Sequence, residues 1–84
     1  MRVRTDDVVW REVDGEVVIL DLKTSTYLST NKTGAHLWKL LQQDRDTDEL
    51  ETSLVDTYGV ERSLAQSDVG AFLDMLRSKE LLIG

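Results

Sequence analysis

The sequence has 84 residues, which suffice for one domain spanning residues 1–84 and leave no room for a second. It contains no cysteine, so disulfide bonds and thiolate metal ligands are excluded, and no apolar run approaches the roughly 20 residues that cross a bilayer. The whole net charge of −6 falls within residues 43–84, an acidic half that repels phosphate backbones, and we expect a soluble, cytoplasmic protein.

The N-terminal third predicts three antiparallel strands. Residues 8–13 and 16–22 are rich in β-branched and apolar residues, and Asp14-Gly15 between them supplies the positive φ of a two-residue hairpin turn. Apolar side chains point to both faces of the second segment, which indicates a central strand with both faces at least partly covered. After a turn at residues 23–25, residues 26–29 predict a third strand at the edge of the sheet.

A first helix follows the third strand. Thr30 or Asn31 supplies its N-terminal cap, because a short polar side chain there accepts a hydrogen bond from a free backbone N–H group. Its apolar positions recur with helical spacing and form one broad stripe: Ala35, Leu37, Trp38, Leu40 and Leu41. Within that stripe we interpret Trp38 as a core anchor, whereas Trp10 can face either side of the first strand.

A second helix begins at Asp46, which has capping-box spacing with Glu49, and it ends at Tyr58 with Gly59 as the terminating glycine. Acidic residues cluster around this start: Asp44, Asp46, Asp48, Glu49 and Glu51. Such residues are expected at a helix N-terminus because they stabilise the helix dipole, and the run lacks the central glycine of a calcium-binding loop. We therefore interpret the cluster as a helix start and not as a metal site.

A third helix is predicted from Ser63, which has capping spacing with Gln66, to about Lys79, and the apolar tail at residues 81–83 follows it. Gly70 lies in the middle of this helix, where glycine costs about 1 kcal/mol relative to alanine. Two interpretations stay open. Gly70 permits the close approach of a neighbour or a ligand, or it is a tolerated exposed glycine.

Catalytic chemistry has few groups to work with. His36 is the only histidine, and we interpret it as a partly exposed surface residue and not as a ligand or base. With one histidine and no cysteine, zinc sites and Ser-His or Cys-His nucleophile systems cannot be assembled. The glycines form no phosphate-binding motif. We therefore expect a protein that is not an enzyme and that binds no cofactor and no metal.

The predicted edge strand is the feature that indicates a function. An edge strand exposes unpaired N–H and C=O groups, which a protein must cover, disrupt or use. Tyr27 flanks these groups, although packing across the strands is the more common role of such a tyrosine. An extended peptide that pairs with the edge is one way to use it.

The order and spacing of the elements carry a resemblance to a known family. Five segments follow the predicted meander: Leu28–Asn31, Thr33–Leu41, Asp48–Gly59, Asp68–Leu76 and Lys79–Ile83. Over essentially the whole chain, this succession resembles the PqqD-like family, the leader-peptide recognition elements of ribosomally made, post-translationally modified peptides. As a stand-alone domain it is most similar to the discrete recognition protein of lasso-peptide pathways. The resemblance implies an α+β winged helix-turn-helix fold with a three-stranded antiparallel meander followed by three helices.

The resemblance also implies a binding mode and partners. The leader adds as a fourth strand to the free edge of the third strand, and its side chains enter a groove between that strand and the third helix. Carried over onto this sequence, the peptide-binding residues form a strand wall and a helix wall: Thr26, Tyr27, Leu28 and Ser29, then Asp68, Ala71, Phe72 and Met75. Phe72 is alternatively a core residue, and Asp68 or Asp74 can meet a basic leader residue. The implied partners are the leader peptide, a cysteine-protease-like leader peptidase and, as a further candidate, the lasso cyclase.

Two other functions stay open at this point. A winged-helix DNA-binding regulator shares this topology, but its recognition helix should be basic, whereas the predicted third helix sets Asp68 and Asp74 against Arg77 and Lys79. A scaffold or small enzyme subunit would need a partner chain for its chemistry. We expect neither nucleic acid nor a membrane as a partner.

Overall fold

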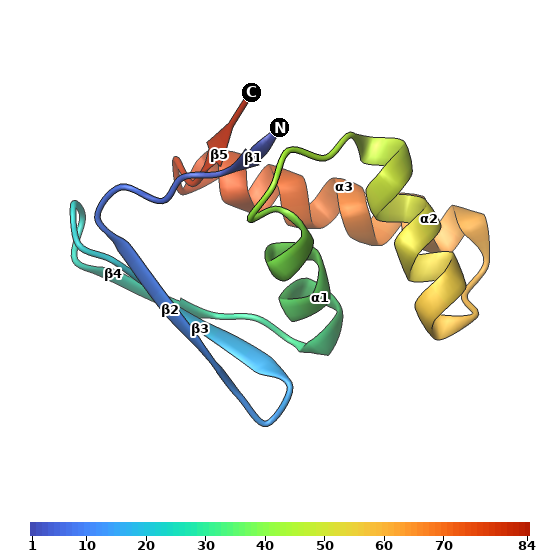
Figure 1. The fold of residues 1–84 in the computed structure, drawn as a ribbon, viewed down its shortest axis with the longest axis horizontal. Helices are drawn as coiled ribbons and strands as arrows, with labels where there is room; N and C mark the ends of the chain where they lie inside the picture. Colours follow the sequence, from blue (N-terminus) through green and yellow to red (C-terminus); the bar gives the residue numbers. More distant parts are fainter.

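The computed structural model describes all residues from Met1 to Gly84 and shows a sheet beside three helices (Figure 1). The elements follow in this order: β1 (Arg2–Val3), β2 (Val8–Val13), β3 (Glu16–Asp21), β4 (Thr26–Ser29), α1 (Lys32–Leu40), α2 (Thr47–Tyr58), α3 (Arg62–Ser78) and β5 (Leu82–Ile83). Strands β2, β3 and β4 form an antiparallel meander. The predicted α+β fold is confirmed. None of the helices combines the length and the apolar character needed to span a bilayer.

The hairpin between β2 and β3 is built by its turn residues. Asp14 and Gly15 have positive φ angles of 53° and 81°, as a two-residue turn requires. Val13 pairs with Glu16 directly beside the turn, and the register continues without a bulge to the far end of β2. The turn therefore fixes which residues of the two strands lie opposite each other, as the sequence predicts.

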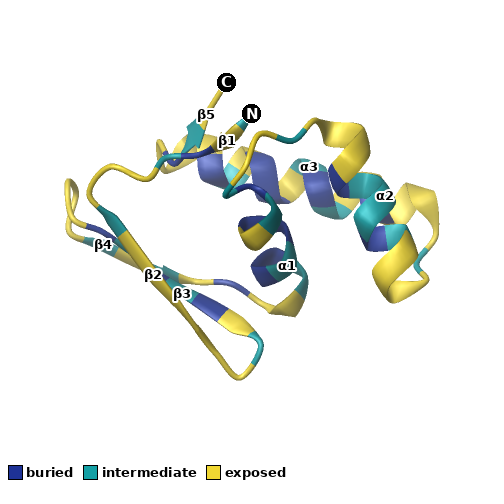
Figure 2. Cartoon of the chain, viewed as in Figure 1, coloured by how far each residue is buried: buried dark blue, intermediate teal, exposed yellow.

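Strand β3 is central, as predicted, but its two faces differ. On the inner face, Val17 and Ile19 are fully buried beneath α1. On the outer face, Val18 and Leu20 are half-buried by their neighbours within the sheet, because the helices lie on the inner side (Figure 2). The outer face of β3 is therefore covered only by side chains of the neighbouring strands, and no helix packs on it. Leu22, predicted on this strand, lies beyond its end and is 53% exposed.

The first two helices begin at the caps expected from the sequence. Asn31 caps α1, since its Oδ1 accepts the N–H of Gly34 at 2.8 Å. Asp46 and Glu49 form a complete capping box on α2, with each side chain accepting the backbone N–H of the other at 2.8 Å and 3.1 Å. Gly59 ends α2 in the left-handed conformation with φ of 66°.

The predicted start of the third helix is wrong. The N-cap of α3 is Glu61, two residues before the predicted capping residue Ser63, and it makes no side-chain cap bond. The helix starts at Arg62, so Ser63 lies inside the first turn. Ala65 N–H donates to the Glu61 carbonyl oxygen at 3.0 Å, which closes the first turn at this position. The side chain of Arg62 also donates to Asp48 on α2. The start of α3 therefore has no side-chain cap bond, and its first residue contacts α2 instead.

The two ends of the chain pair with each other, which was not expected from the sequence. Arg2–Val3 (β1) and Leu82–Ile83 (β5) form a two-stranded antiparallel sheet, and both termini lie side by side in Figure 1. Val3 N–H donates to the Leu41 carbonyl oxygen at 2.9 Å, which ties this pair to the end of α1. Segments of two residues carry too little pattern to be read as strands from sequence.

The core lies around α1, which packs between the sheet and α3. Fifteen buried apolar residues form it: Val3, Val17, Ile19, Ala35, Leu37, Trp38, Leu41, Leu50, Leu54, Ala65, Val69, Phe72, Leu73, Leu76 and Leu81. Trp38 is fully buried, which confirms its interpretation as a core anchor. Trp10 lies on the inner side of β2, where its ring meets the Trp38 ring edge to face, with centroids 6.2 Å apart and planes at 80°.

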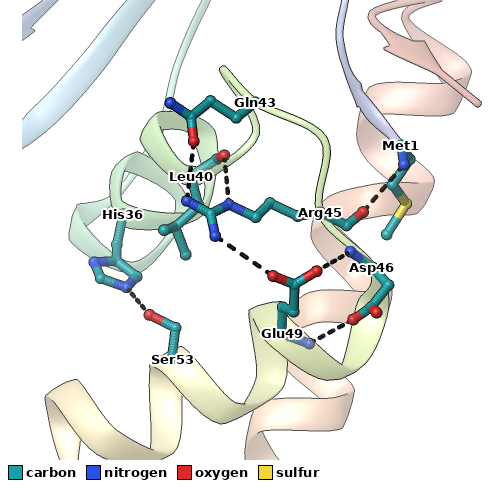
Figure 3. A network of polar contacts seen from close by, with 8 residues as sticks. All are labelled: Met1, His36, Leu40, Gln43, Arg45, Asp46, Glu49 and Ser53. Atoms are coloured by element: carbon teal, nitrogen blue, oxygen red, sulfur yellow. Dashed lines mark hydrogen bonds and ion pairs between the residues drawn. The ribbon is translucent and has the colours of Figure 1, made fainter.

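Arg45 holds the junction between α1 and α2 (Figure 3). Its Nε donates to the Leu40 carbonyl oxygen at 3.3 Å, and its guanidinium reaches Glu49 at 3.4 Å. Its backbone carbonyl oxygen accepts from the N-terminal amine of Met1 at 3.1 Å. One residue thus links the chain start, the end of α1 and the capping box of α2.

His36 also bridges the two helices. Its Nε2 lies 2.7 Å from Ser53 Oγ (Figure 3). Its ring also meets the Tyr58 ring edge to face, with centroids 5.5 Å apart. Burial lowers the pKa of His36, and the charge of Lys39 lowers it further. No group of three histidine or carboxylate side chains in the chain is arranged to hold a metal ion. The contacts with Ser53 and Tyr58 give His36 a packing role between α1 and α2.

Candidate functional site

Strand β4 has an open edge. It is the last strand of the meander, so only one of its two edges is paired. In an antiparallel ladder, residues bonded to the partner strand alternate with residues whose N–H and C=O groups point the other way. Thr30 N–H donates to the Val17 carbonyl oxygen at 2.8 Å, which places Leu28, two residues earlier, in the bonded set. The backbone groups of Tyr27 and Ser29 therefore point to the open edge.

A hollow of about 280 Å³ lies between the start of α1 and the middle of α3. One wall comes from α3: Asp68, Ala71, Phe72 and Met75. The other comes from α1 and its cap: Asn31, Thr33, Gly34 and Leu37. Phe72 and Leu37 are buried and form an apolar floor, while Asp68 is half-buried at the rim and makes no ion pair within the chain. We name this space the apolar hollow.

A second hollow of about 150 Å³ lies between β4 and the end of α3. The sheet side contributes Asp21, Thr24, Thr26 and Leu28. The helix side contributes Ser78, Lys79, Glu80 and Leu81. We name it the polar hollow, and we name the two hollows together the trough. Both hollows lie along α3, and the polar hollow is the one that β4 lines.

The structure separates the eight predicted site residues into three groups. Thr26 and Leu28 line the polar hollow. The four helix residues, Asp68, Ala71, Phe72 and Met75, line the apolar hollow, but they face α1 and not β4. Tyr27 and Ser29 point to the outer face of the sheet, because neighbouring strand residues alternate between faces. Phe72 is both core and trough floor, and Asp74 lies outside the trough with an ion pair to Arg77.

Sequence reasoning missed the wall that α1 contributes. The signal that could have found it is Gly34, a glycine in the first turn of a helix with an apolar stripe. A Cβ at this position would lie 3.0 Å from Thr30 Cβ and 3.2 Å from Phe72 Cε1, so α1 approaches α3 this closely only without a side chain there. At Gly70, no heavy atom lies within 4 Å of an added Cβ. Close approach within the chain therefore occurs at Gly34, and Gly70 has no such neighbour.

The two glycines form a matched pair for a test of stability. Gly70→Ala should raise the free energy of unfolding by about 1 kcal/mol, because it improves helix propensity without a clash. Gly34→Ala should give no gain and should push the Phe72 ring into the apolar hollow. Urea denaturation followed by circular dichroism measures both. Equal gains from the two variants would show that Gly34 is not crowded in solution.

Asp21 closes the sheet end of the polar hollow and is 2% exposed. Its carboxylate accepts from the Arg4 guanidinium at 2.5 Å and from Lys23 N–H at 3.0 Å. Arg4 also donates to the Glu80 carbonyl oxygen at 3.1 Å, so the pair ties the sheet to the end of α3. Burial alone would raise the pKa of Asp21, but the hydrogen bonds from Lys23 and Arg4 outweigh it and hold the pKa below its usual range.

This pair should make stability depend on pH in the acid range. A carboxyl whose pKa is lower in the folded chain stabilises the fold above its unfolded pKa of about 3.9, and the contribution disappears as pH falls through the folded value. The stability difference between the wild type and Asp21→Asn should therefore be constant above about pH 5 and shrink below about pH 4. Urea unfolding at several pH values measures it. A difference that stays constant into the acid range would contradict the role of the Asp21 charge.

The meander, the open edge and the trough agree with a family of known proteins. Residues 16–82 match the family described as coenzyme PQQ synthesis protein D (PqqD). The chain belongs to this PqqD family. This match confirms the resemblance to the PqqD-like family that the sequence indicates. No curated protein matches the chain.

Two solved structures extend the likeness to the PqqD family over the complete fold. TbiB1 in complex with the TbiA(beta) leader peptide is 36% identical, with a TM-score of 0.88 over 100% of this chain and 96% of that chain. Lasso peptide synthetase B1 complexed with the leader peptide is 24% identical, with a TM-score of 0.83 over 99% of this chain and 96% of that chain. At the lower identity, the likeness shows the fold alone.

Proposed function

We propose that this PqqD-family chain is a non-catalytic recognition element that binds the leader segment of a ribosomally made precursor peptide. The leader adds as a strand to β4 and is presented to a partner leader peptidase, with a cyclase as a further partner, in cytoplasmic lasso-peptide biosynthesis. Membership of the PqqD family supports this function. So does the 36% identity to TbiB1, whose structure contains a leader peptide.

The open edge of β4 beside the trough is the observation that carries the proposal. Strand addition takes its affinity from main-chain hydrogen bonds and its selectivity from pockets that accept alternate side chains. Tyr27 and Ser29 can make the main-chain hydrogen bonds, because their backbone groups point to the open edge. The polar hollow and the apolar hollow are the candidate pockets for leader side chains. Asp68 at the rim of the apolar hollow suits a basic leader residue.

Binding of this kind speeds a reaction without chemistry in the chain itself. A disordered leader loses conformational entropy when it binds, so affinity depends on a site that already has its bound shape. The trough and the strand edge are both formed in the free chain. Once the leader is held, its downstream end reaches a high effective concentration at a peptidase bound to the same complex.

A peptide titration tests the function. We expect fluorescence anisotropy to rise when the chain is added to a labelled TbiA(beta) leader peptide, or to the labelled leader of the precursor encoded beside this chain's own gene. A scrambled peptide of the same composition is the control. Flat curves for both leaders into the high micromolar range would overturn the proposal, and a salt-dependent shift of duplex DNA would favour the DNA-binding alternative.

A further inference from the structure

The outer face of the sheet carries an apolar surface that the trough does not include. A shallow hollow of about 240 Å³ lies on it, lined by Val9, Arg11, Val18, Leu20 and Tyr27, and by Trp10, whose ring lies on the inner side. No helix covers this face, which lies opposite α1 in Figure 2. Val9 is 52% exposed and Tyr27 is 67% exposed, so large apolar groups meet solvent here. Exposed apolar surface of this kind commonly marks an interaction site.

Three of these residues form one row across the sheet. Val9 pairs with Leu20, and Leu20 pairs with Tyr27, so the row crosses β2, β3 and β4 in register. Residues opposite each other in neighbouring strands place their side chains on the same face. The row therefore ends at the open edge of β4, with the Tyr27 ring as its last member and no side chain beyond it. We name it the outer row.

The position of the outer row determines what an added strand would place beside it. The backbone N–H and C=O groups of Tyr27 point to the open edge, so they bond to the residue directly opposite when the added strand is antiparallel. That residue shares the face of Tyr27 and becomes a fourth member of the outer row. The residues immediately before and after it point to the inner face, beside Thr26 and Leu28 in the polar hollow.

We propose that the outer row is a second recognition surface for the leader, which selects an apolar or aromatic leader residue opposite Tyr27. This inference rests on the proposed function, because the row is continuous with the edge at which the leader adds. The leader is then recognised on both faces of the extended sheet. Its binding segment is therefore read at adjacent positions, with an apolar residue for the outer row and its neighbour for the polar hollow, and not only at alternate positions.

Double-mutant cycles test the inference. Tyr27→Thr removes the ring but keeps a β-branched residue and the backbone N–H, and Leu28→Ala alters the inner face. The probe is the labelled leader that binds the wild type more tightly, either that of TbiA(beta) or that of the neighbouring precursor. Each variant is titrated with a set of peptides in which single positions of this leader are replaced by alanine. We expect Tyr27 to couple to one leader position by about five-fold in Kd, and Leu28 to couple to an adjacent position. Val13→Thr, at an exposed β2 position outside the outer row and its hollow, is the control and should leave Kd unchanged.

Each other outcome overturns the inference without removing the proposed function. Tyr27→Thr could bind every peptide as the wild type does, or Tyr27 and Leu28 could couple to the same leader position. Sedimentation could also show a wild-type dimer that Tyr27→Thr dissociates at unchanged leader affinity, which would assign the outer row to a second copy of the chain. The proposed function fails separately, when the wild type binds neither leader.

Discussion

Ser29→Pro should weaken leader binding by about 100-fold while the chain stays folded. Proline removes the N–H that points to the open edge, leaves a leader carbonyl group without a partner and puts a ring where the added strand must lie. It breaks no bond to β3, because Ser29 belongs to the set that faces away from the meander. The peptide titration measures the loss, and circular dichroism confirms the fold.

Two further proline variants make the result specific. Glu12→Pro removes an outward N–H from β2, the opposite edge of the same sheet, and should leave leader affinity within about two-fold of the wild type. Leu28→Pro removes a bond to β3 and should unfold the sheet, so its loss of binding is uninformative about the edge. Normal binding by folded Ser29→Pro, or equal losses for Ser29→Pro and Glu12→Pro, would place the leader elsewhere.

Trp38→Ala should lower the free energy of unfolding by about 3–5 kcal/mol. Trp38 is fully buried where α1 meets the sheet, and its removal leaves a cavity that the Trp10 ring borders. A domain of this size has a total stability of only about 5–10 kcal/mol, so the variant should be partly unfolded at 37 °C. Urea unfolding by circular dichroism measures the change.

Trp10→Ala is the matched control for that large effect. Trp10 is 37% exposed, so its removal leaves no closed cavity and should cost clearly less than the loss of Trp38. Trp38→Phe separates packing from polarity, because Trp38 Nε1 has no hydrogen-bond partner, so its removal breaks no hydrogen bond and takes away an unsatisfied buried donor. Equal losses for Trp10→Ala and Trp38→Ala would contradict the assignment of Trp38 as the core anchor.

The parts of the fold that local signals encode could be predicted from sequence. Asp14-Gly15 requires a two-residue turn, and Asp46 with Glu49 satisfies a helix start through its own side chains. The start of α3 could not be predicted in this way, because its N-cap makes no side-chain bond. The first residue of the helix, Arg62, instead contacts Thr52 and Asp48 on α2. The pairing of β1 with β5 joins residues from opposite ends of the chain, and neither segment carries a pattern by itself.

The candidate site shows the same division. The edge position of residues 26–29 followed from chain order in a simple meander, and the sheet confirms it. Which of these residues face the trough depends on the register with β3, so Tyr27 and Ser29 were assigned to a wall that only Thr26 and Leu28 line. The wall that α1 contributes could not be predicted, because it depends on the packing of α1 on α3, which brings Gly34 against Phe72.

The pairing of the chain ends has a consequence for how a catalytic partner can be attached. Leu81 lines the polar hollow, and the next residue, Leu82, pairs with Val3. Both termini thus emerge within a few residues of the polar hollow. An enzyme joined covalently to either terminus would therefore start from the same corner of the domain, beside the polar hollow.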